Sequence, residues 1–201
     1  REQHIRRDKA TSNICTAQSL LAVMASMYAV YHGPEGLRDI AERIHAHTRS
    51  LAVSLGASDH LKVVNTCYFD TLKIFVGGGE DAMKALRARS ESKRVNLRYY
   101  ADGEHVGVSL NERTNDQDFA NLCSALGISP VQGVGFDATF LGPIAREVDY
   151  LHHPVFNRYR SETEMMRYIK QLENRDLSLT HAMIPLGSCT MKLNPHHHQI
   201  I

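Results

Sequence analysis

Closely paired cysteines are missing from this sequence of 201 residues. Its four cysteines, Cys15, Cys67, Cys123 and Cys189, lie far apart, and no Cys-x-x-Cys spacing occurs. Zinc sites and disulfide-stabilised scaffolds normally show close pairs or a high density of cysteine. The spacing therefore argues against both classes and indicates buried or free thiols in a reducing compartment.

An excess of charge of either sign is also missing. Lysine and arginine total 23, aspartate and glutamate total 22, and the formal net charge is +1. Such a balance creates no field that would attract nucleic acid or an anionic membrane. No apolar run approaches the roughly 20 residues that a membrane-spanning helix needs. The composition, with 43% hydrophobic residues, is that of a soluble globular protein.

Two helices are expected in the first third of the chain. Apolar residues recur at intervals of three and four from Ile14 to Tyr28, and Gly33-Pro34 is typical of the end of a helix. A second helix is predicted from about Pro34 to Leu55, with Gly56 as its stop. Because the first helix is apolar around most of its circumference, we expect a high exposure of its side chains when this chain is alone.

Between these helices and residue 128, β-rich segments alternate with shorter helical ones. Asp102-Gly103 predicts a tight hairpin turn, since glycine tolerates positive φ. Thr114 with Gln117 predicts a capping box at the start of a helix that Gly127 ends. We therefore predict a ββαββα unit, an α/β layer fold of about 100 residues. The other elements are expected at Leu61–Tyr68, Leu72–Val76, Glu80–Arg89, Asn96–Tyr100 and His105–Leu110.

The remaining third has less regular patterning. Residues 129–157 carry Gly and Pro without a sustained period and are predicted to form an extended connector. Ser161 and Glu164 predict a capping box for an amphipathic helix that runs to about Glu173. Residues 184–201 have turn residues and no period, so no helix or strand is expected there.

Three motifs have structural interpretations that we prefer. Gly133-x-Gly135-x-x-Ala138 resembles a dinucleotide fingerprint, but it is not placed between a strand and a helix of a βαβ unit. The run Gly77–Gly79 is predicted to be a turn rather than a phosphate-binding loop. His196–His198 are adjacent in sequence and cannot easily direct three imidazoles to one metal ion, so we expect no metal site.

The segment REQHIRRDKATSN at residues 1–13 concentrates positive charge ahead of a helix. Its cations include Arg6, Arg7 and Lys9, and Asn13 follows them. Such a cluster could hold a phosphate or a carboxylate at the helix N-terminus. Composition alone favours the simpler interpretation, a solvated charged loop.

The segment PLGSCTMKLN at residues 185–194 is the second candidate site. Ser188, Cys189 and Thr190 could donate hydrogen bonds to a carboxylate, and Lys192 could supply a positive charge. A catalytic Cys189 would need a positioned base, and the sequence shows none. We therefore predict a binding loop; a thiol- or metal-based site built from Cys189 and the histidines is a lesser alternative.

Both candidate segments belong to long, unusual strings of sequence. REQHIRRDKATSNICTAQ (residues 1–18) and IPLGSCTMKLN (184–194) closely resemble the P-protein family of the glycine cleavage system. The connector PVQGVGFDATF (130–140) and SETEMMRYIKQLENRDLSL (161–179) fit the same family in the same order. The resemblance covers residues 1–194, and the chain begins with Arg1 rather than Met, so we expect it to be an internal piece of a longer protein.

The resemblance implies a protein of two similar halves, each with the type I fold of pyridoxal-phosphate (PLP) enzymes. Residues 1–33 would end the large domain of the first half, and residues 34–128 would form its small C-terminal α/β domain. Residues 129–194 would be the connector and the start of the second half, whereas 195–201 would be a divergent tail. Only the second half would bind PLP, through a lysine in a histidine-lysine motif followed by a glycine-rich loop.

The resemblance also implies a reaction: decarboxylation of glycine, with transfer of the aminomethyl group to the lipoyl arm of the H-protein. Ser188, Cys189, Thr190 and Lys192 would border the substrate tunnel. A second set, at the interface between the halves or beneath it, would be structural: Arg6, Arg7, Lys9 and Asn13.

No lysine here stands in the required PLP motif, so the chain alone is expected to be inactive. The expected partners are the rest of the P-protein and the lipoylated H-protein, in a homodimer or a two-subunit assembly. The expected compartment is the mitochondrial matrix in a eukaryote and the cytoplasm otherwise. The alternative is a non-catalytic α/β module for interaction or scaffolding.

Overall fold

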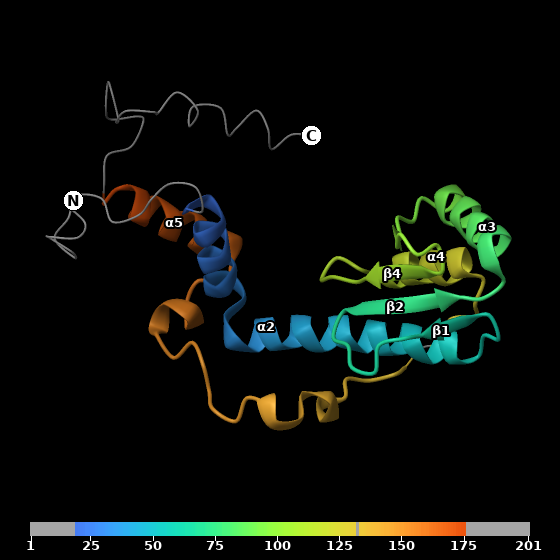
Figure 1. Ribbon diagram of the computed structural model, residues 1–201. Coiled ribbons are helices and arrows are strands. Elements are labelled where there is room, and N and C mark those ends of the chain that lie inside the picture. The colour runs from blue at the N-terminus through green and yellow to red at the C-terminus, as the bar shows by residue number, and fades with distance from the viewer. Residues whose placement is uncertain (1–18, 132, 176–201) are drawn as a thin grey trace, which may run out of the picture. The chain divides into compact units, whose positions relative to one another are not determined.

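The computed structural model describes residues 19–131 and 133–175, and these form two compact units (Figure 1). One unit joins residues 19–34 with the segment that starts at Leu151, and the other is Glu35–Tyr150. No helix in the described ranges is both long and apolar enough to cross a membrane.

Helix α2 (Ser19–Gly56) supplies residues to both units. Gly33 interrupts it with φ 61° and ψ −173°, and Pro34 follows. Since only glycine adopts such dihedrals at little cost and proline cannot continue a hydrogen-bonded helix, the element comprises two helices that meet there. The predicted boundary at Gly33-Pro34 is confirmed, whereas the predicted start of the first helix lies outside the described residues.

The unit Glu35–Tyr150 contains a four-stranded antiparallel sheet in the order β1-β2-β4-β3. Its sequence of elements is ββαββα, as predicted. The bounds are β1 Leu61–Val63, β2 Thr71–Val76, α3 Gly79–Ser92, β3 Arg98–Tyr99, β4 His105–Ser109 and α4 Asp116–Leu126. The chain is therefore a mixed helix-and-sheet fold, consistent with the α/β prediction.

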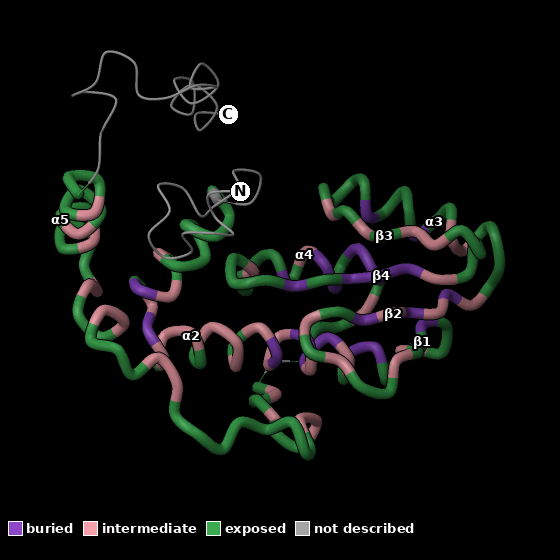
Figure 2. The backbone as a smooth tube through the Cα atoms, turned by 60° about the vertical axis from the view of Figure 1, so that its left-hand side comes forward, coloured by how far each residue is buried: buried purple, intermediate pink, exposed green. Residues whose placement is uncertain are grey.

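One face of the sheet carries the core. Leu72, Ile74 and Val76 of β2 are buried, and Val106 and Val108 of β4 are buried beside them (Figure 2). These positions alternate along each strand, as expected for a half-buried sheet. The helices contribute the other members of the same cluster: Leu51 and Leu55 of α2, Leu86 of α3, and Phe119, Leu122, Cys123 and Leu126 of α4.

Two strand predictions were too long. β1 ends at Val63 rather than Tyr68. Beyond it, the Asn65 side chain, and not its backbone, forms hydrogen bonds to the backbone of β2. Asn65 Oδ1 accepts from the Lys73 amide at 2.9 Å, and Asn65 Nδ2 donates to the Thr71 carbonyl at 3.0 Å. β3 is likewise reduced to Arg98–Tyr99.

The hairpin and the helix ends follow local chemistry. Asp102 Oδ1 accepts from the Glu104 and His105 amides, and Gly103 has φ +72°, which confirms the predicted turn. The N-cap predicted for α4 is wrong by one residue. Asn115 rather than Thr114 is the N-cap, and it forms a capping box with Asp118. Gly127 ends this helix with φ 74°, as predicted.

The last segment contains short helices. Within the expected connector, the 3-10 helices η3 (Ala138–Ile144) and η4 (Pro154–Asn157) form, each with a capping side chain. Helix α5 (Glu162–Glu173) begins after Ser161, whose Oγ accepts from the Glu164 amide at 3.3 Å. The predicted helix and its capping residue are confirmed.

The first helical segment is open, as expected. Leu20, Leu21, Val23 and Met24 are between 56% and 68% exposed. Exposed apolar side chains in one short segment usually mark a missing partner surface.

Candidate functional site

All residues of the two candidate sites lie outside the part of the chain that the structure describes, so their geometry stays a prediction. The same is true of His196–His198. The two sets are Arg6, Arg7, Lys9 and Asn13, and Ser188, Cys189, Thr190 and Lys192.

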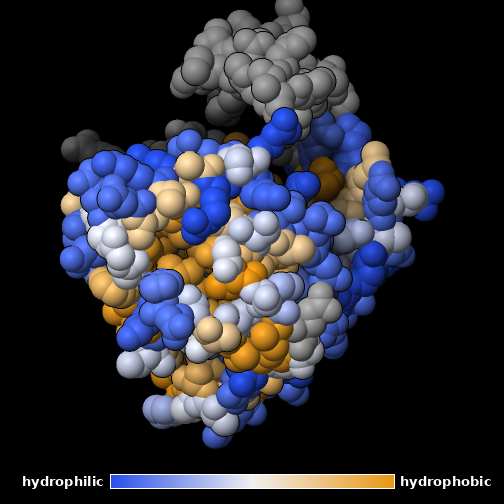
Figure 3. All heavy atoms as spheres, turned by 90° about the vertical axis from the view of Figure 1, so that its right-hand side faces the viewer, coloured by the Kyte–Doolittle hydropathy of each residue, from blue (hydrophilic) through white to orange (hydrophobic). Residues whose placement is uncertain are grey.

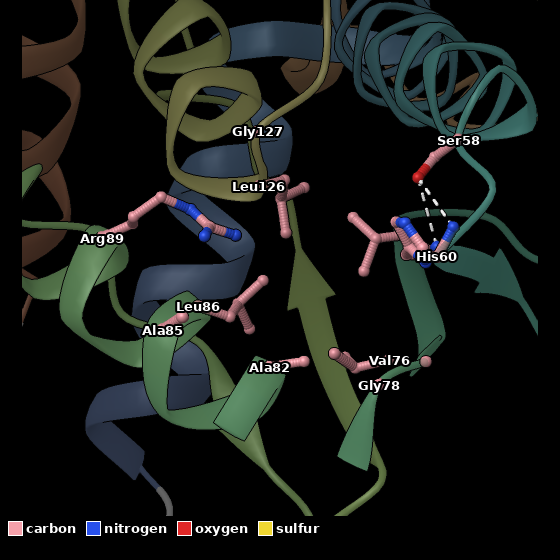
Figure 4. Close-up of a pocket in the computed structure, with 12 residues that line it drawn as sticks. Ser58, His60, Val76, Gly78, Ala82, Ala85, Leu86, Arg89, Leu126 and Gly127 are labelled. Atoms are coloured by element: carbon pink, nitrogen blue, oxygen red, sulfur yellow. Dashed lines mark hydrogen bonds between the residues drawn. The ribbon is translucent and has the colours of Figure 1, made fainter. Parts of the chain in front are cut away.

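A pocket of about 450 Å³ lies beside the turn after β2 (Figure 4). Gly77 and Gly78 line it where β2 passes into α3, and Leu86 of α3 and Leu126 of α4 form its apolar wall. Figure 3 views the side on which α3 lies in Figure 1, and hydrophobic residues gather there among hydrophilic ones.

Two polar side chains that line this pocket, Ser58 and Arg89, have structural partners. Ser58 Oγ accepts from the amides of His60 and Leu61 at 3.3 and 3.2 Å. Arg89 Nε donates to the Ala125 carbonyl at 3.2 Å, which places a cation near the C-terminal end of α4. Because the hydroxyl is engaged in a turn and the guanidinium in a helix end, these groups stabilise local structure and form no nucleophile–base pair. The glycine run is a turn, as predicted.

Sequence reasoning missed a buried histidine that holds the connector to α2. His45 is 2% exposed, and its Nδ1 donates to the Phe69 carbonyl at 3.0 Å. The ring of Phe140 stacks on His45 at 4.3 Å between centroids, and Phe136 meets it edge-on at 5.4 Å. The aromatic pair four residues apart at 136 and 140 was the available signal, but nothing in the sequence places it against residue 45.

An ion pair supports the same attachment. Arg49 Nη2 lies 3.4 Å from Asp137 Oδ2, and its Nη1 donates to the Gly135 carbonyl. Hydrogen bonds from the Thr139 side chain and amide lower the pKa of Asp137, and the positive charge of Arg49 acts in the same direction. The Gly133–Ala138 motif follows no strand and opens a 3-10 helix, so its interpretation as a dinucleotide site is rejected.

PLP needs a lysine directed into a pocket. Of the described lysines, Lys93 lines a pocket of about 240 Å³ together with Arg94 and Asp118, but it stands in no histidine-lysine motif. Among the lysines in the described ranges, none lines the pocket of Figure 4. Lys84 pairs with Glu80 at 2.7 Å, and Lys170 pairs with Glu173 at 2.8 Å. None of the described lysines stands in the histidine-lysine motif that would anchor PLP.

Thiols and metals give no alternative centre in the described part. Cys67 is exposed and free, and Cys123 is buried and free. Burial raises the pKa of the Cys123 thiol, which makes it a poor nucleophile. No group of three or more His, Cys, Asp or Glu side chains suited to a metal ion occurs among the described residues.

Comparison with known proteins gives a consistent result. The model of the glycine cleavage system P-protein matches residues 1–126. Proteins named glycine dehydrogenase (decarboxylating) from Thermosynechococcus vestitus and Shewanella amazonensis are 54% and 55% identical to this chain over 194 and 204 residues. The mitochondrial protein of that name from Gallus gallus is 48% identical over 201 residues.

These matches cover nearly all of this chain but only a small part of each relative. Each covers 96% of this chain and 20% of the relative, so the chain spans about a fifth of the length of the curated relatives it matches. The family model covers more than half of the chain, and the identity is near 50% over almost all of it. This chain belongs to the glycine cleavage system P-protein family.

Proposed function

We propose that this chain is part of a glycine decarboxylase of the glycine cleavage system. The intact protein decarboxylates glycine with PLP and passes the aminomethyl group to the lipoyl arm of the H-protein. The observation that carries the proposal is the 54% identity, over 96% of the chain, to a glycine dehydrogenase (decarboxylating). PLP supplies an electron sink for the charge that loss of CO₂ leaves on the α-carbon.

Within the intact protein, this chain supports the structure and contributes residues that line the substrate tunnel. Residues 34–128 are proposed to be the small domain of the first half, within a type I PLP fold, preceded by the end of its large domain in residues 1–33. Residues 129–194 lead into the second half, where Ser188, Cys189, Thr190 and Lys192 border the substrate tunnel. Arg6, Arg7, Lys9 and Asn13 stabilise the contact between halves. The exposed apolar side chains of Leu20, Leu21, Val23 and Met24 are covered by the remaining polypeptide in the intact protein. Their exposure of more than half in this chain supports this part of the proposal.

The proposal extends to partners and compartment. The lipoylated H-protein is the acceptor, and the assembly is a homodimer or a pair of different subunits. In a eukaryote the compartment is the mitochondrial matrix, in line with the name of the Gallus gallus relative, and otherwise it is the cytoplasm.

A substitution in the proposed tunnel tests this function. In the intact protein, with H-protein present, Lys192→Met should lower kcat/KM for exchange of labelled CO₂ into glycine by roughly tenfold or more, because a charge near the substrate carboxylate is lost. The matched control is Lys93→Met, since Lys93 is exposed; it should leave exchange unchanged. An intact protein without exchange activity would overturn the proposed reaction, whereas equal activity of the two variants would remove Lys192 from the tunnel.

A further inference from the structure

The second face of the sheet, opposite the core, has a distinct composition. The strand register sets Lys62, Phe75 and His105 in one row across β1, β2 and β4. A neighbouring row across β2, β4 and β3 contains Lys73, Gly107 and Arg98. Because alternate residues point to opposite faces, both rows lie on the side away from Ile74 and Val106. This surface, called the cationic sheet face below, consists of Lys62, Lys73, Phe75, Arg98, Tyr100, His105 and Gly107.

One tyrosine organises the cations on this face. Lys73 Nζ and Arg98 Cζ each lie 4.8 Å from the centre of the Tyr100 ring. A Cβ added to Gly107 would lie 3.4 Å from the same ring, so the glycine leaves the room that Tyr100 occupies. Two cations from strands on either side of β4 are thereby brought to one ring, an attraction that holds them in place without cancelling their charge.

The positive charge of the face is not neutralised by described carboxylates. Among the ion pairs found within the described ranges, one joins His105 of this face to Asp102, whereas Lys62, Lys73 and Arg98 take part in none. The carboxylate closest in sequence to Tyr100, Asp102, lies 2.9 Å from His105 Nδ1 and serves the hairpin turn. An unpaired cluster of three cations on one sheet face therefore remains although the whole chain is nearly neutral.

We propose that the cationic sheet face is a docking surface for a carboxylate-rich segment of a protein partner. The charges of Lys62, Lys73 and Arg98 complement such a segment and orient it, and the apolar ring of Phe75 beside them gives it contact area. A single-stranded nucleic acid fits less well. Stacking of successive bases requires a series of free aromatic faces. On this face the Tyr100 ring is engaged by Lys73 and Arg98, and the Phe75 ring meets the His105 ring edge-on. This inference does not depend on the proposed reaction.

Binding of a defined probe tests the surface. The full chain is titrated into a fluorescently labelled peptide of alternating Glu and Gly, and the anisotropy of the peptide measures binding. Circular dichroism checks that each variant is folded. The double variant Lys73→Gln, Arg98→Gln should weaken binding roughly tenfold, since two exposed charge pairs are lost. Salt at about 0.5 M should weaken binding by the chain itself, because the contacts are solvent-exposed.

Two further variants make the test specific. Lys93→Gln with Arg113→Gln removes two positive charges from exposed positions outside the face and should leave binding unchanged. Lys73→Arg with Arg98→Lys keeps the charge and should retain binding. An equal loss in the Lys93/Arg113 control, absence of peptide binding by the folded chain, or tighter binding of a single-stranded oligonucleotide than of the peptide would each overturn the proposal.

Discussion

Replacement of Ile74 by alanine is expected to lower the free energy of unfolding by about 3 to 4 kcal/mol, within the range of about 2 to 5 kcal/mol found for such changes in closed cores. Ile74 is fully buried at the centre of β2 and shares its cluster with Leu51, Val106 and Phe119, which come from three other elements. Since strand pairing on both sides fixes the backbone, the cavity cannot close by a local shift.

The control for this prediction uses the same chemical change. Ile144 is 79% exposed, so Ile144→Ala should alter the free energy of unfolding by less than about 0.5 kcal/mol. Urea denaturation followed by circular dichroism measures both variants. A loss below about 1 kcal/mol for Ile74→Ala would show that this sheet is not the core of the unit.

Replacement of His45 by alanine is expected to cost about 2 to 4 kcal/mol and to release the connector. Two effects add: the stacked ring on Phe140 is lost, and the Phe69 carbonyl loses its donor. His45→Phe keeps an aromatic ring but not the donor, so its cost should be smaller, about 1 to 2 kcal/mol.

The release is measured by limited proteolysis. Cleavage in residues 135–144 should become faster in His45→Ala than in the unchanged chain. His60→Ala is the control, because His60 is exposed and its side chain has no role in this cluster. Unchanged proteolysis in His45→Ala would mean that other contacts hold the connector. These are the contacts of Arg49 with Gly135 and Asp137, and the hydrogen bond from the Val131 amide to Ser54 Oγ at 2.8 Å.

The parts of the fold that could be predicted depend on local chemistry. The break at Gly33-Pro34, the turn at Asp102-Gly103 and the cap at Ser161 each need only a few neighbouring residues, and each was predicted correctly. β1 was predicted too long because its end depends on a side chain, Asn65, that bonds across to β2. A hydropathy pattern does not predict that a side chain will form these hydrogen bonds instead of the strand backbone.

The candidate site divides in the same way. The family was recognised from strings at residues 1–18 and 184–194, although the structure does not describe either. The cluster at His45 joins three segments that are 24 to 95 residues apart, and periodicity carries no information on such contacts. The alternation of apolar and polar residues in β2 and β4 predicts which side chains point away from the core. It does not predict that Lys73 and Arg98 both lie over the Tyr100 ring on the outer face.

We propose that the lysine that anchors PLP in the intact protein is none of the lysines of this chain, because none of them stands in a histidine-lysine motif. The most direct measurement is incubation of the full chain with one equivalent of PLP, reduction with borohydride, and peptide mapping by mass spectrometry. We expect only scattered, substoichiometric labelling of surface lysines, and no absorbance band that depends on one particular lysine. A one-to-one adduct on a single lysine, abolished by replacing that residue with methionine, would contradict the account.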